Sequence, residues 1–257
     1  MKLDDESIFN LLIEEAEDKI FSGWDFSYIT KTGRNKTEPL KWSYTSKILP
    51  YIRNAKSMLD MGTGGGEYLT LLQPFPETTF ATESYKPNIP IARERLNPFG
   101  IEVMEVIDDD NLPFKSEMFD LIINRHESYN PDEVYRILMK KGLFISQQVG
   151  GDNDIELNKR LGAEIDESII HWKLEYAVTE LETSGFTILE KKEDFPKTRY
   201  YDTGAVVYQL KAIPWQISDF TADKYKDKLF ELHKEIRNNG YIEIKSHRFL
   251  IIAEKNE

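Results

Sequence analysis

The sequence predicts an α/β fold in which helices wind around both sides of a mostly parallel sheet. Three observations carry this prediction. Short apolar runs alternate with helical stretches from residue 56 onward, one of these runs is apolar on both faces, and a glycine-rich turn directly follows the first run. Such alternation is typical of βαβ units, and a run that is apolar on both faces is typical of a central parallel strand.

Two helices are expected before the sheet begins. Residues 3–20 carry apolar side chains at helical spacing and acidic side chains on the other face. Residues 23–37 are expected to form a loop, and residues 40–52 a second helix with Pro39 at its start.

Strands and helices then alternate as the predicted sheet requires. The strands expected in this part cover residues 57–61, 79–82, 101–107, 119–124 and 142–147. The helices between them are expected through residue 72, at 89–96 and at 131–139. After these, the sequence predicts a helix at about 170–184 that ends at Gly185, and two strands at 186–191 and 241–253.

The expected organisation is an N-terminal helical addition at 1–54 and a larger domain at 55–257. That domain contains an insertion at about 196–240, before the last strand. Within it, residues 202–213 are either helical or extended, and residues 222–238 form a charged helix with Thr221 as a suitable N-cap.

The composition bounds the class of protein. Of 257 residues, 40% are hydrophobic and 30% are charged, which is typical of a globular chain. The net charge of −12 weighs against a nucleic-acid partner without excluding a local basic patch, because phosphate binding requires clustered Lys and Arg. Cysteine is absent, so disulfides, Cys zinc sites and thiol nucleophiles are excluded. The acidic start and the lack of a long apolar run predict a cytoplasmic protein without a membrane span.

The most informative motif is the segment 59–67, which has the sequence LDMGTGGGE. Glycines at a strand-to-helix turn let the backbone adopt positive φ and approach a ligand closely. A dinucleotide fingerprint would need glycine where Glu67 stands, and a carboxylate there would repel a pyrophosphate. No Lys-Ser or Lys-Thr follows, so a P-loop is excluded as well. The acids Asp60 and Glu67 favour a ligand that carries an ammonium and a sulfonium.

Four segments in order resemble the class I S-adenosylmethionine-dependent methyltransferases. The first is an acid followed by G-x-G-x-G, matched by Asp60, Gly62, Gly64 and Gly66. The second is an acid at the end of the second strand, matched by Glu83.

The third segment places acids shortly before Leu-Pro-Phe, matched by Asp108 and Asp109, and is followed by Phe-Asp and an apolar strand. The fourth, at 136–143, resembles an R-x-L-K-P-G-G run, with Lys141 in place of Pro and Leu143 in place of the second Gly. We expect this departure to affect a surface turn and not the chemistry. The resemblance covers residues 55–150 well and the rest weakly.

The resemblance implies a Rossmann-like, seven-stranded sheet and S-adenosyl-L-methionine as the cofactor. It implies that Glu83 binds the ribose hydroxyls and that Asp108 and Asp109 line the adenine. Ser84, next to Glu83, and Asn124, at the end of the fourth strand, are also expected at the cofactor.

The family's acceptor site lies near the end of strand four, where this sequence has Arg125 and His126. His126 is a candidate general base, and Arg125 a candidate anchor for a carboxylate or phosphate of the acceptor. The plainer interpretation, that His126 caps or packs and Arg125 pairs with Glu127, stays open. Gln147 and Gln148 at the end of strand five either face the acceptor or satisfy the backbone. His171, His233 and His247 are expected to be structural, and no spacing predicts a metal site.

Aromatic residues are frequent in the N-terminal part, as Trp24, Phe26, Tyr28, Trp42 and Tyr44. They belong either to a lid over the cofactor or to ordinary packing of added helices. The tyrosines and the tryptophan of the insertion either shape an acceptor pocket or anchor the insertion to the sheet.

The leading functional hypothesis is an enzyme that methylates a small molecule. A second hypothesis is an rRNA or tRNA methyltransferase, for which the basic cluster Lys31, Arg34, Lys36, Lys41 and Lys47 is the candidate contact. A third is a protein that binds S-adenosylmethionine without catalysis.

Overall fold

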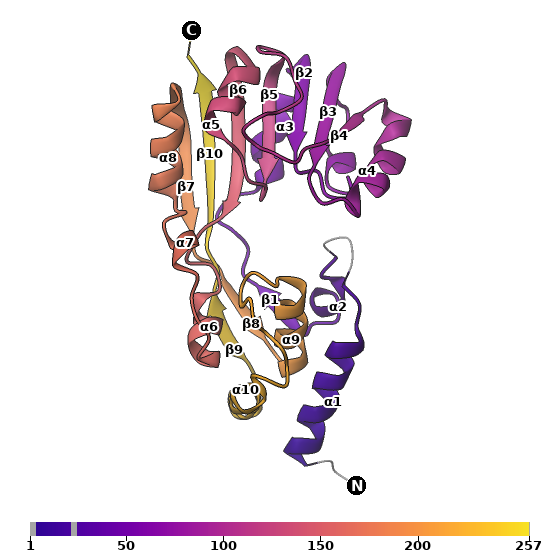
Figure 1. The fold of residues 1–257 in the computed structure, drawn as a ribbon, viewed down its shortest axis with the longest axis vertical. Coiled ribbons are helices and arrows are strands. Elements are labelled where there is room, and N and C mark those ends of the chain that lie inside the picture. Colours follow the sequence, from indigo (N-terminus) through magenta and orange to yellow (C-terminus); the bar gives the residue numbers. More distant parts are fainter. Residues whose placement is uncertain (1–3, 22–24, 257) are drawn as a thin grey trace. The chain divides into compact units, whose positions relative to one another are not determined.

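The computed structural model describes residues 4–21 and 25–256 and divides into two compact units (Figure 1). The seven-stranded unit consists of Lys41–Gly150, Trp172–Asp194 and Arg248–Glu257. The three-stranded unit consists of Met1–Leu40, Gly151–His171 and Phe195–His247. Among the residues described, no helix is both long and apolar enough to cross a membrane.

The seven-stranded unit has the predicted doubly wound architecture. Its sheet has the order β4-β3-β2-β5-β6-β10-β7, in which β2 to β6 run parallel to one another and β10 is antiparallel to both β6 and β7. The strands are β2 (Ser57–Met61), β3 (Thr78–Glu83), β4 (Glu102–Glu105), β5 (Phe119–Arg125), β6 (Leu138–Val149), β7 (Phe186–Asp194) and β10 (Arg248–Lys255). The prediction of a mostly parallel, seven-stranded sheet is confirmed.

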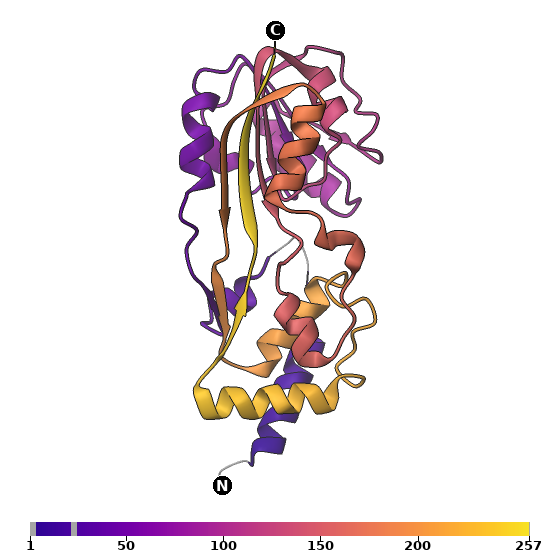
Figure 2. The ribbon, with the colours of Figure 1, turned by 90° about the vertical axis from the view of Figure 1, so that its left-hand side faces the viewer.

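Helices cover both faces of this sheet, and Figure 2 shows α3 on one face and α5 and α8 on the other. The helical segments are α3 (Tyr44–Ile52), η1 (Leu69–Leu72), α4 (Asn88–Leu96), η2 (Asn97–Phe99), α5 (Pro131–Ile137) and α8 (Leu174–Thr183). Phe119, Ile122 and Phe144 of the central strands are fully buried against α5 and α8. This two-sided burial explains why the run at 119–124 is apolar on both faces.

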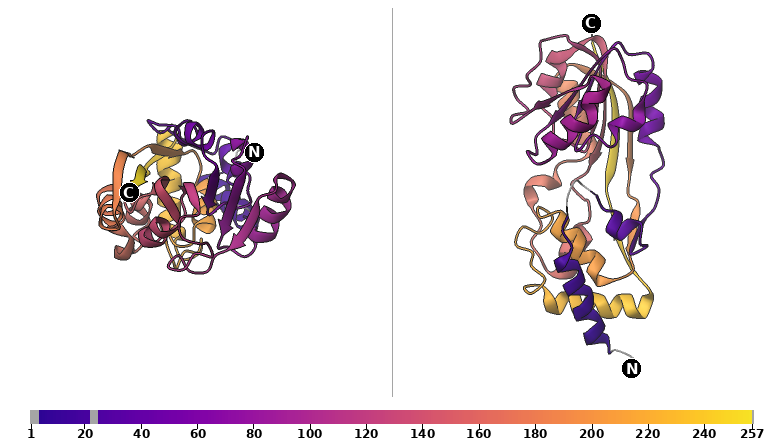
Figure 3. Two further views of the ribbon diagram at one scale, coloured as in Figure 1. Left: turned by 90° about the horizontal axis from the view of Figure 1, so that it is seen from above. Right: turned by 90° about the vertical axis from the view of Figure 1, so that its right-hand side faces the viewer.

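The three-stranded unit has a core of its own. Its antiparallel sheet has the order β1-β8-β9, with β1 (Asn35–Thr37), β8 (Lys197–Tyr200) and β9 (Ile242–Lys245). Its helices are α1 (Asp5–Asp18), α2 (Ser27–Thr30), α6 (Ile155–Leu161), α7 (Glu167–Ile170), α9 (Thr203–Ala212) and α10 (Lys226–Asn239). Helix α1 lies beside α9 (Figure 3), and Phe9, Tyr200 and Tyr208 are buried between these elements.

The expected single strand at 241–253 is wrong, because it divides into β9 and β10, which belong to different sheets. Ser246 and His247 interrupt it. The Ser246 hydroxyl donates to Asp154 Oδ1 at 3.0 Å, and the His247 N–H donates to Asn153 Oδ1 at 3.1 Å. These side-chain acceptors turn the chain away from a continuous ladder.

Several helix boundaries also differ from the prediction. The helix expected through residue 72 is only the 3₁₀ segment η1. Gly66, with φ 81°, extends the glycine turn, so the helical segment begins later than expected. Helix α5 ends at Ile137 because Leu138 already pairs with Phe119. Helix α3 begins at Tyr44, where the Ser43 hydroxyl caps it by accepting from the Ser46 N–H at 3.2 Å.

The remaining differences lie in the three-stranded unit and at its borders. The loop expected at 23–37 contains α2 and β1, and residues 202–213 form the helix α9. Helices α7 and α8 replace the single helix expected at 170–184, whereas α6 and β8 were not expected at all. Thr221 caps the turn before α10, since its hydroxyl accepts from the Lys224 N–H at 3.1 Å and α10 begins only at Lys226.

The two units follow packing and differ from the division expected at residue 54. Helix α3 lies before that boundary, yet it packs against β5 and η1. The insertion shares its unit with the N-terminal segment and with residues 151–171. Such an assembly from three separate segments has no local sequence pattern that would predict it.

Candidate active site

The glycine loop leaves the carboxyl end of β2, between the neighbouring strands β3 and β5. Gly62, Gly64 and Gly66 have φ values of 66°, 63° and 81°. These left-handed conformations cost little for glycine and are strained for other residues. The loop is tied to β3, because the Thr63 N–H donates to Thr82 O at 2.8 Å. The predicted use of glycine at this turn is therefore confirmed in its geometry.

Gly62 is required for a second reason, which is a close approach. A Cβ atom at this position would lie 2.4 Å from the Cβ of Glu127. The loop thereby contacts the segment that follows β5, and any side chain at Gly62 would push the two apart.

Three carboxyl groups surround the loop. Asp60 and Glu83 are buried and Glu127 is half-buried. Burial raises the pKa of Asp60 to about 7, and Arg125 opposes part of this rise. Burial, together with the charges of Glu83 and Asp109, raises the pKa of Glu127 to about 7. Within the described part of the chain, none of the three forms an ion pair, so the cluster favours a cationic ligand.

Glu83 ends β3 beside the loop. Burial raises its pKa, whereas the backbone N–H groups of Tyr85, Gly64 and Ser84 lower it by stabilising the carboxylate. The Tyr85 N–H donates to Glu83 Oε1 at 2.8 Å. Backbone donors of the loop and of the segment after β3 thus hold this carboxylate in place.

The structure connects two further predicted residues to the segment after β5. The Ser84 hydroxyl donates to Glu127 Oε1 at 3.2 Å, and the Ser128 hydroxyl donates to Asp109 Oδ2 at 2.6 Å. Asp108 is exposed and accepts from the Asp110 N–H at 2.9 Å, so it shapes its own turn. Ser84 and Asp109 thus lie with the acid cluster, and Asp108 lies at its edge.

Asn124 is fully buried at the end of β5. Its Oδ1 accepts from Gln148 Nε2 at 2.8 Å, and its backbone oxygen accepts from the Tyr44 hydroxyl at 3.0 Å. Its Nδ2 has no hydrogen-bond partner among the described residues. A buried donor without a partner costs about 1–3 kcal/mol, which a bound ligand would recover.

Arg125 is exposed, and its guanidinium lies over the Tyr68 ring, 4.4 Å from the centroid. Tyr68 stacks on Tyr44 at 6.1 Å and shares a hydrogen bond of 2.8 Å with Thr45. The pairing of Arg125 with Glu127 that the plainer interpretation expects does not occur among the described residues. An aromatic ring holds the guanidinium and leaves its donors open to an anion.

His126 occupies a strained turn directly after β5, with φ 70°. Its N–H donates to Gln147 O at 2.8 Å. Although the residue keeps exposed surface, desolvation of its ring lowers the pKa of His126 well below the usual value, and Arg248 and Arg125 lower it further. The imidazole is therefore neutral at pH 7.

The tautomer of His126 follows from its partners. The Trp42 Nε1–H donates to Gln147 Oε1 at 2.9 Å, and this fixes Gln147 Nε2 as the group that faces His126 Nε2 at 3.3 Å. An amide nitrogen only donates, so His126 Nε2 is the acceptor and Nδ1 carries the proton. Gln147 thus holds the histidine, and Gln148 holds Asn124.

Other predicted candidates lie elsewhere. Tyr28 packs in the core of the three-stranded unit, where Arg34 and Lys19 lie over its ring. Phe26 packs there too, and Trp24 lies outside the described residues. In the same unit, His233 stacks on Phe230 and His247 on Phe195.

Two residues of this site, Glu127 and Tyr68, are not among those that the sequence predicts. Glu127 is expected only as a partner of Arg125, although its place just after a parallel strand is a usable signal. Tyr68, two residues after the glycine loop, carried no such signal. Its role depends on the tertiary contact between α3, the loop and β5. Nowhere in the described chain do three or more His, Asp or Glu residues form a group that could hold a metal.

Comparison with known proteins agrees with this geometry. Residues 59–146 match the model of a methyltransferase domain family, Methyltransf_11. The match covers part of the chain, from β2 to β6, and includes the glycine loop and every residue predicted to bind the cofactor.

Solved structures share the fold at low sequence identity. A candidate methyltransferase from Bacillus halodurans C-125 superimposes with a TM-score of 0.60 and 19% identity, over 83% of this chain and 99% of the other. The YcgJ protein from Bacillus subtilis gives 0.58 and 16%, over 83% and 98%. A protein of unknown function from Deinococcus radiodurans R1 gives 0.56 and 13%, over 97% and 99%. No curated protein sequence matches the chain.

Proposed function

We propose that the methyltransferase domain binds S-adenosyl-L-methionine over the loop at residues 60–66 and methylates a small-molecule acceptor. One observation carries the proposal: Asp60, Glu83 and Glu127 surround the glycine loop at the strand ends, and none of them forms an ion pair with a described residue. Buried carboxylates that form no ion pair are costly to the fold. A cationic ligand would remove much of that cost.

The residues at the loop fit this cofactor. Asp60 would attract its ammonium and sulfonium charges, and Glu83 would accept from the ribose hydroxyls. Asp109 would lie at the adenine, with Asp108 at the edge, and Asn124 offers its free Nδ2 donor. When bound, the cofactor supplies a methyl group on a sulfonium, which makes that carbon electrophilic.

The chain's own task is to hold the acceptor atom in line with the methyl group, which contributes several kcal/mol to lowering the barrier. Arg125 would bind a carboxylate or phosphate of the acceptor, because its donors are open. His126 is neutral and therefore suited to accept a proton. To act as a base, His126 would accept the proton at Nε2. This would replace the long, 3.3 Å contact between Nε2 and Gln147.

The ion pairs of the predicted basic cluster favour a small acceptor over RNA. Arg34 pairs with Asp202 at 2.6 Å, Lys41 with Asp194 at 2.8 Å, and Lys47 with Glu190 at 2.7 Å. Three of the five cations are thus already neutralised by acids. A phosphate backbone would have to displace these acids.

Calorimetric titration with S-adenosylmethionine, and with NADH as a control, tests the proposal. We expect saturable binding of the methyl donor alone, weakened at least tenfold in Glu83→Ala. Glu77→Ala, an exposed acid before the other end of β3, is the matched control and should bind normally. Binding of NADH, or normal binding by Glu83→Ala, would refute the placement of the cofactor. Binding without turnover on any acceptor would support the non-catalytic alternative.

A further inference from the structure

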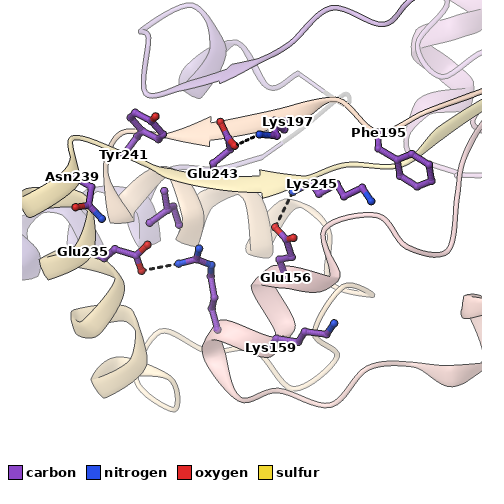
Figure 4. A pocket seen from close by; sticks show the side chains of 11 residues that line it. Glu156, Lys159, Phe195, Lys197, Glu235, Asn239, Tyr241, Glu243 and Lys245 are labelled. Carbon is purple, nitrogen blue, oxygen red and sulfur yellow. Dashed lines mark hydrogen bonds and ion pairs between the residues drawn. The ribbon is translucent and has the colours of Figure 1, made fainter.

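The three-stranded unit contains a groove of about 780 Å³ (Figure 4). It lies along β9, and its other walls come from α6 and α10. All of its lining residues belong to this unit. The volume is within the range of ligand sites, so the groove is large enough for a short peptide or a small molecule.

The floor of the groove is a sheet edge that is open at one residue, Glu243. The Ser246 N–H points toward β8, because it donates to Pro196 O at 2.8 Å. Hydrogen-bonding direction alternates along an antiparallel strand, so the N–H and C=O of Lys245 and Glu243 point away from β8. The contacts of Lys245 are consistent with this direction. Its N–H donates to Glu156 Oε2 at 3.1 Å, and its C=O accepts from the Asp154 N–H at 3.1 Å.

Glu243 is the next outward residue on this edge. Its backbone N–H and C=O have no partner among the residues that the structure describes. They face a groove that Glu243 itself lines. A donor and an acceptor side by side on an edge strand are what a second extended backbone pairs with.

Four cationic and three acidic side chains line the groove. Glu243 pairs with Lys197 at 2.6 Å, and Glu235 pairs with Arg160 at 2.6 Å. In contrast, Lys159 and Lys245 form no ion pair with any described residue. The Lys245 ammonium lies 4.1 Å over the Phe195 ring, as Figure 4 shows at one end of the groove. Glu156, the third acid, forms no ion pair with a described residue either, and its Oε2 accepts from the Lys245 N–H. The lining thus keeps one net positive charge in a chain of net charge −12.

We propose that this groove binds an extended, acidic peptide segment of a partner protein as an added strand on β9. The peptide backbone pairs with the N–H and C=O of Glu243, and an acidic side chain of the peptide lies between Lys159 and Lys245. The amide pair selects for a backbone, and the two ammonium groups select for negative charge. This site is independent of the methyl-transfer site, so each of the two proposals can be tested without the other.

Fluorescence anisotropy with a labelled peptide of alternating Val and Glu tests the proposal. We expect saturable binding to the full-length protein. Binding should fall at least tenfold in Lys159→Glu and Lys245→Glu. Both lysines are exposed, so the variants should fold, and circular dichroism checks this. Lys226→Glu, on the exposed start of α10, is the matched control and should bind normally.

Two further probes separate the parts of the proposal. A peptide with alternate N-methylated amides cannot donate to the edge, and a peptide with Lys in place of Glu lacks the charge. Both should bind at least tenfold more weakly. Equal binding of either, or no binding of the acidic peptide, would overturn the proposal. So would a peptide-insensitive dimer in light scattering, which would assign the edge to a second copy of the chain.

Discussion

Buried charges are treated differently in the two units. In the three-stranded unit, Arg34 Nε and Nη2 contact both oxygens of Asp202, at 2.9 and 2.6 Å. In the seven-stranded unit, Asp60 and Glu83 are more deeply buried and form no ion pair with any residue that the structure describes. In the first arrangement the chain itself supplies both charges of the ion pair. In the second, the carboxylates are neutralised only when a ligand brings positive charge, so buried carboxylates without an ion pair indicate a binding site.

The paired charges should have the largest effect on stability. Asp202→Ala removes the bidentate partner of the Arg34 guanidinium and leaves it only Glu15 and Tyr28. It also removes the N-cap of α9, where Asp202 Oδ1 accepts from the Ala205 N–H at 2.9 Å. We expect a loss of about 3 kcal/mol in the free energy of unfolding. Urea unfolding followed by circular dichroism measures it. Glu14→Ala, an exposed acid on α1, should cost little. A loss below about 1 kcal/mol in Asp202→Ala would show that the pair is not structural.

The unpaired charges should instead link cofactor binding to pH. Asp60 and Glu127 each have a pKa of about 7, and a cationic ligand favours their ionised forms. Affinity for S-adenosylmethionine should therefore rise about tenfold from pH 6 to 7.5, with release of protons on binding. Calorimetry in buffers of different ionisation enthalpy counts these protons. S-adenosylhomocysteine, which lacks the sulfonium charge, should show a weaker dependence. The same flat profile for both ligands would contradict the linkage.

The fold and the site were predictable to different degrees from the sequence. The glycine loop and Glu83 follow from local pattern, because glycine conformation and strand-end position are encoded within a few residues. The pairing of Trp42 with Gln147 and the stacking of Arg125 on Tyr68 join residues far apart in the chain. No single-sequence pattern encodes such contacts. The three-stranded unit was missed for the same reason, since its sheet joins residues 35–37, 197–200 and 242–245.

A smaller effect is expected at Asp60, where a substitution should stabilise the fold while it weakens cofactor binding. Its folded pKa lies above that of an unfolded aspartate, so its stabilising protonated form is complete below about pH 4 and lost as the pH rises through 7. Asp60→Asn removes the buried charge. We expect the variant to exceed the wild type by about 1 kcal/mol at pH 8 and by much less at pH 5, while it binds the cofactor more weakly. Thermal unfolding at both pH values tests this. A variant less stable at pH 8 would mean that the carboxylate supports the fold.

The smallest effect concerns how Gln147 holds His126. Because Trp42 fixes the amide, Gln147 donates to His126 Nε2 and places the ring proton on Nδ1. In Gln147→Glu a carboxylate oxygen would replace that donor, so the proton should move to Nε2 and the pKa of His126 should rise by about one unit. Nitrogen-15 NMR of the imidazole reports both changes directly, without an acceptor. Trp42→Phe is the companion variant, since it frees the amide to rotate and should mix the two tautomers. An Nε2–H tautomer already in the wild type would show that Trp42 and Gln147 do not control the ring. If the tautomer moves as expected, Gln147 is a positioning residue, and its contribution to turnover can be measured separately from that of His126.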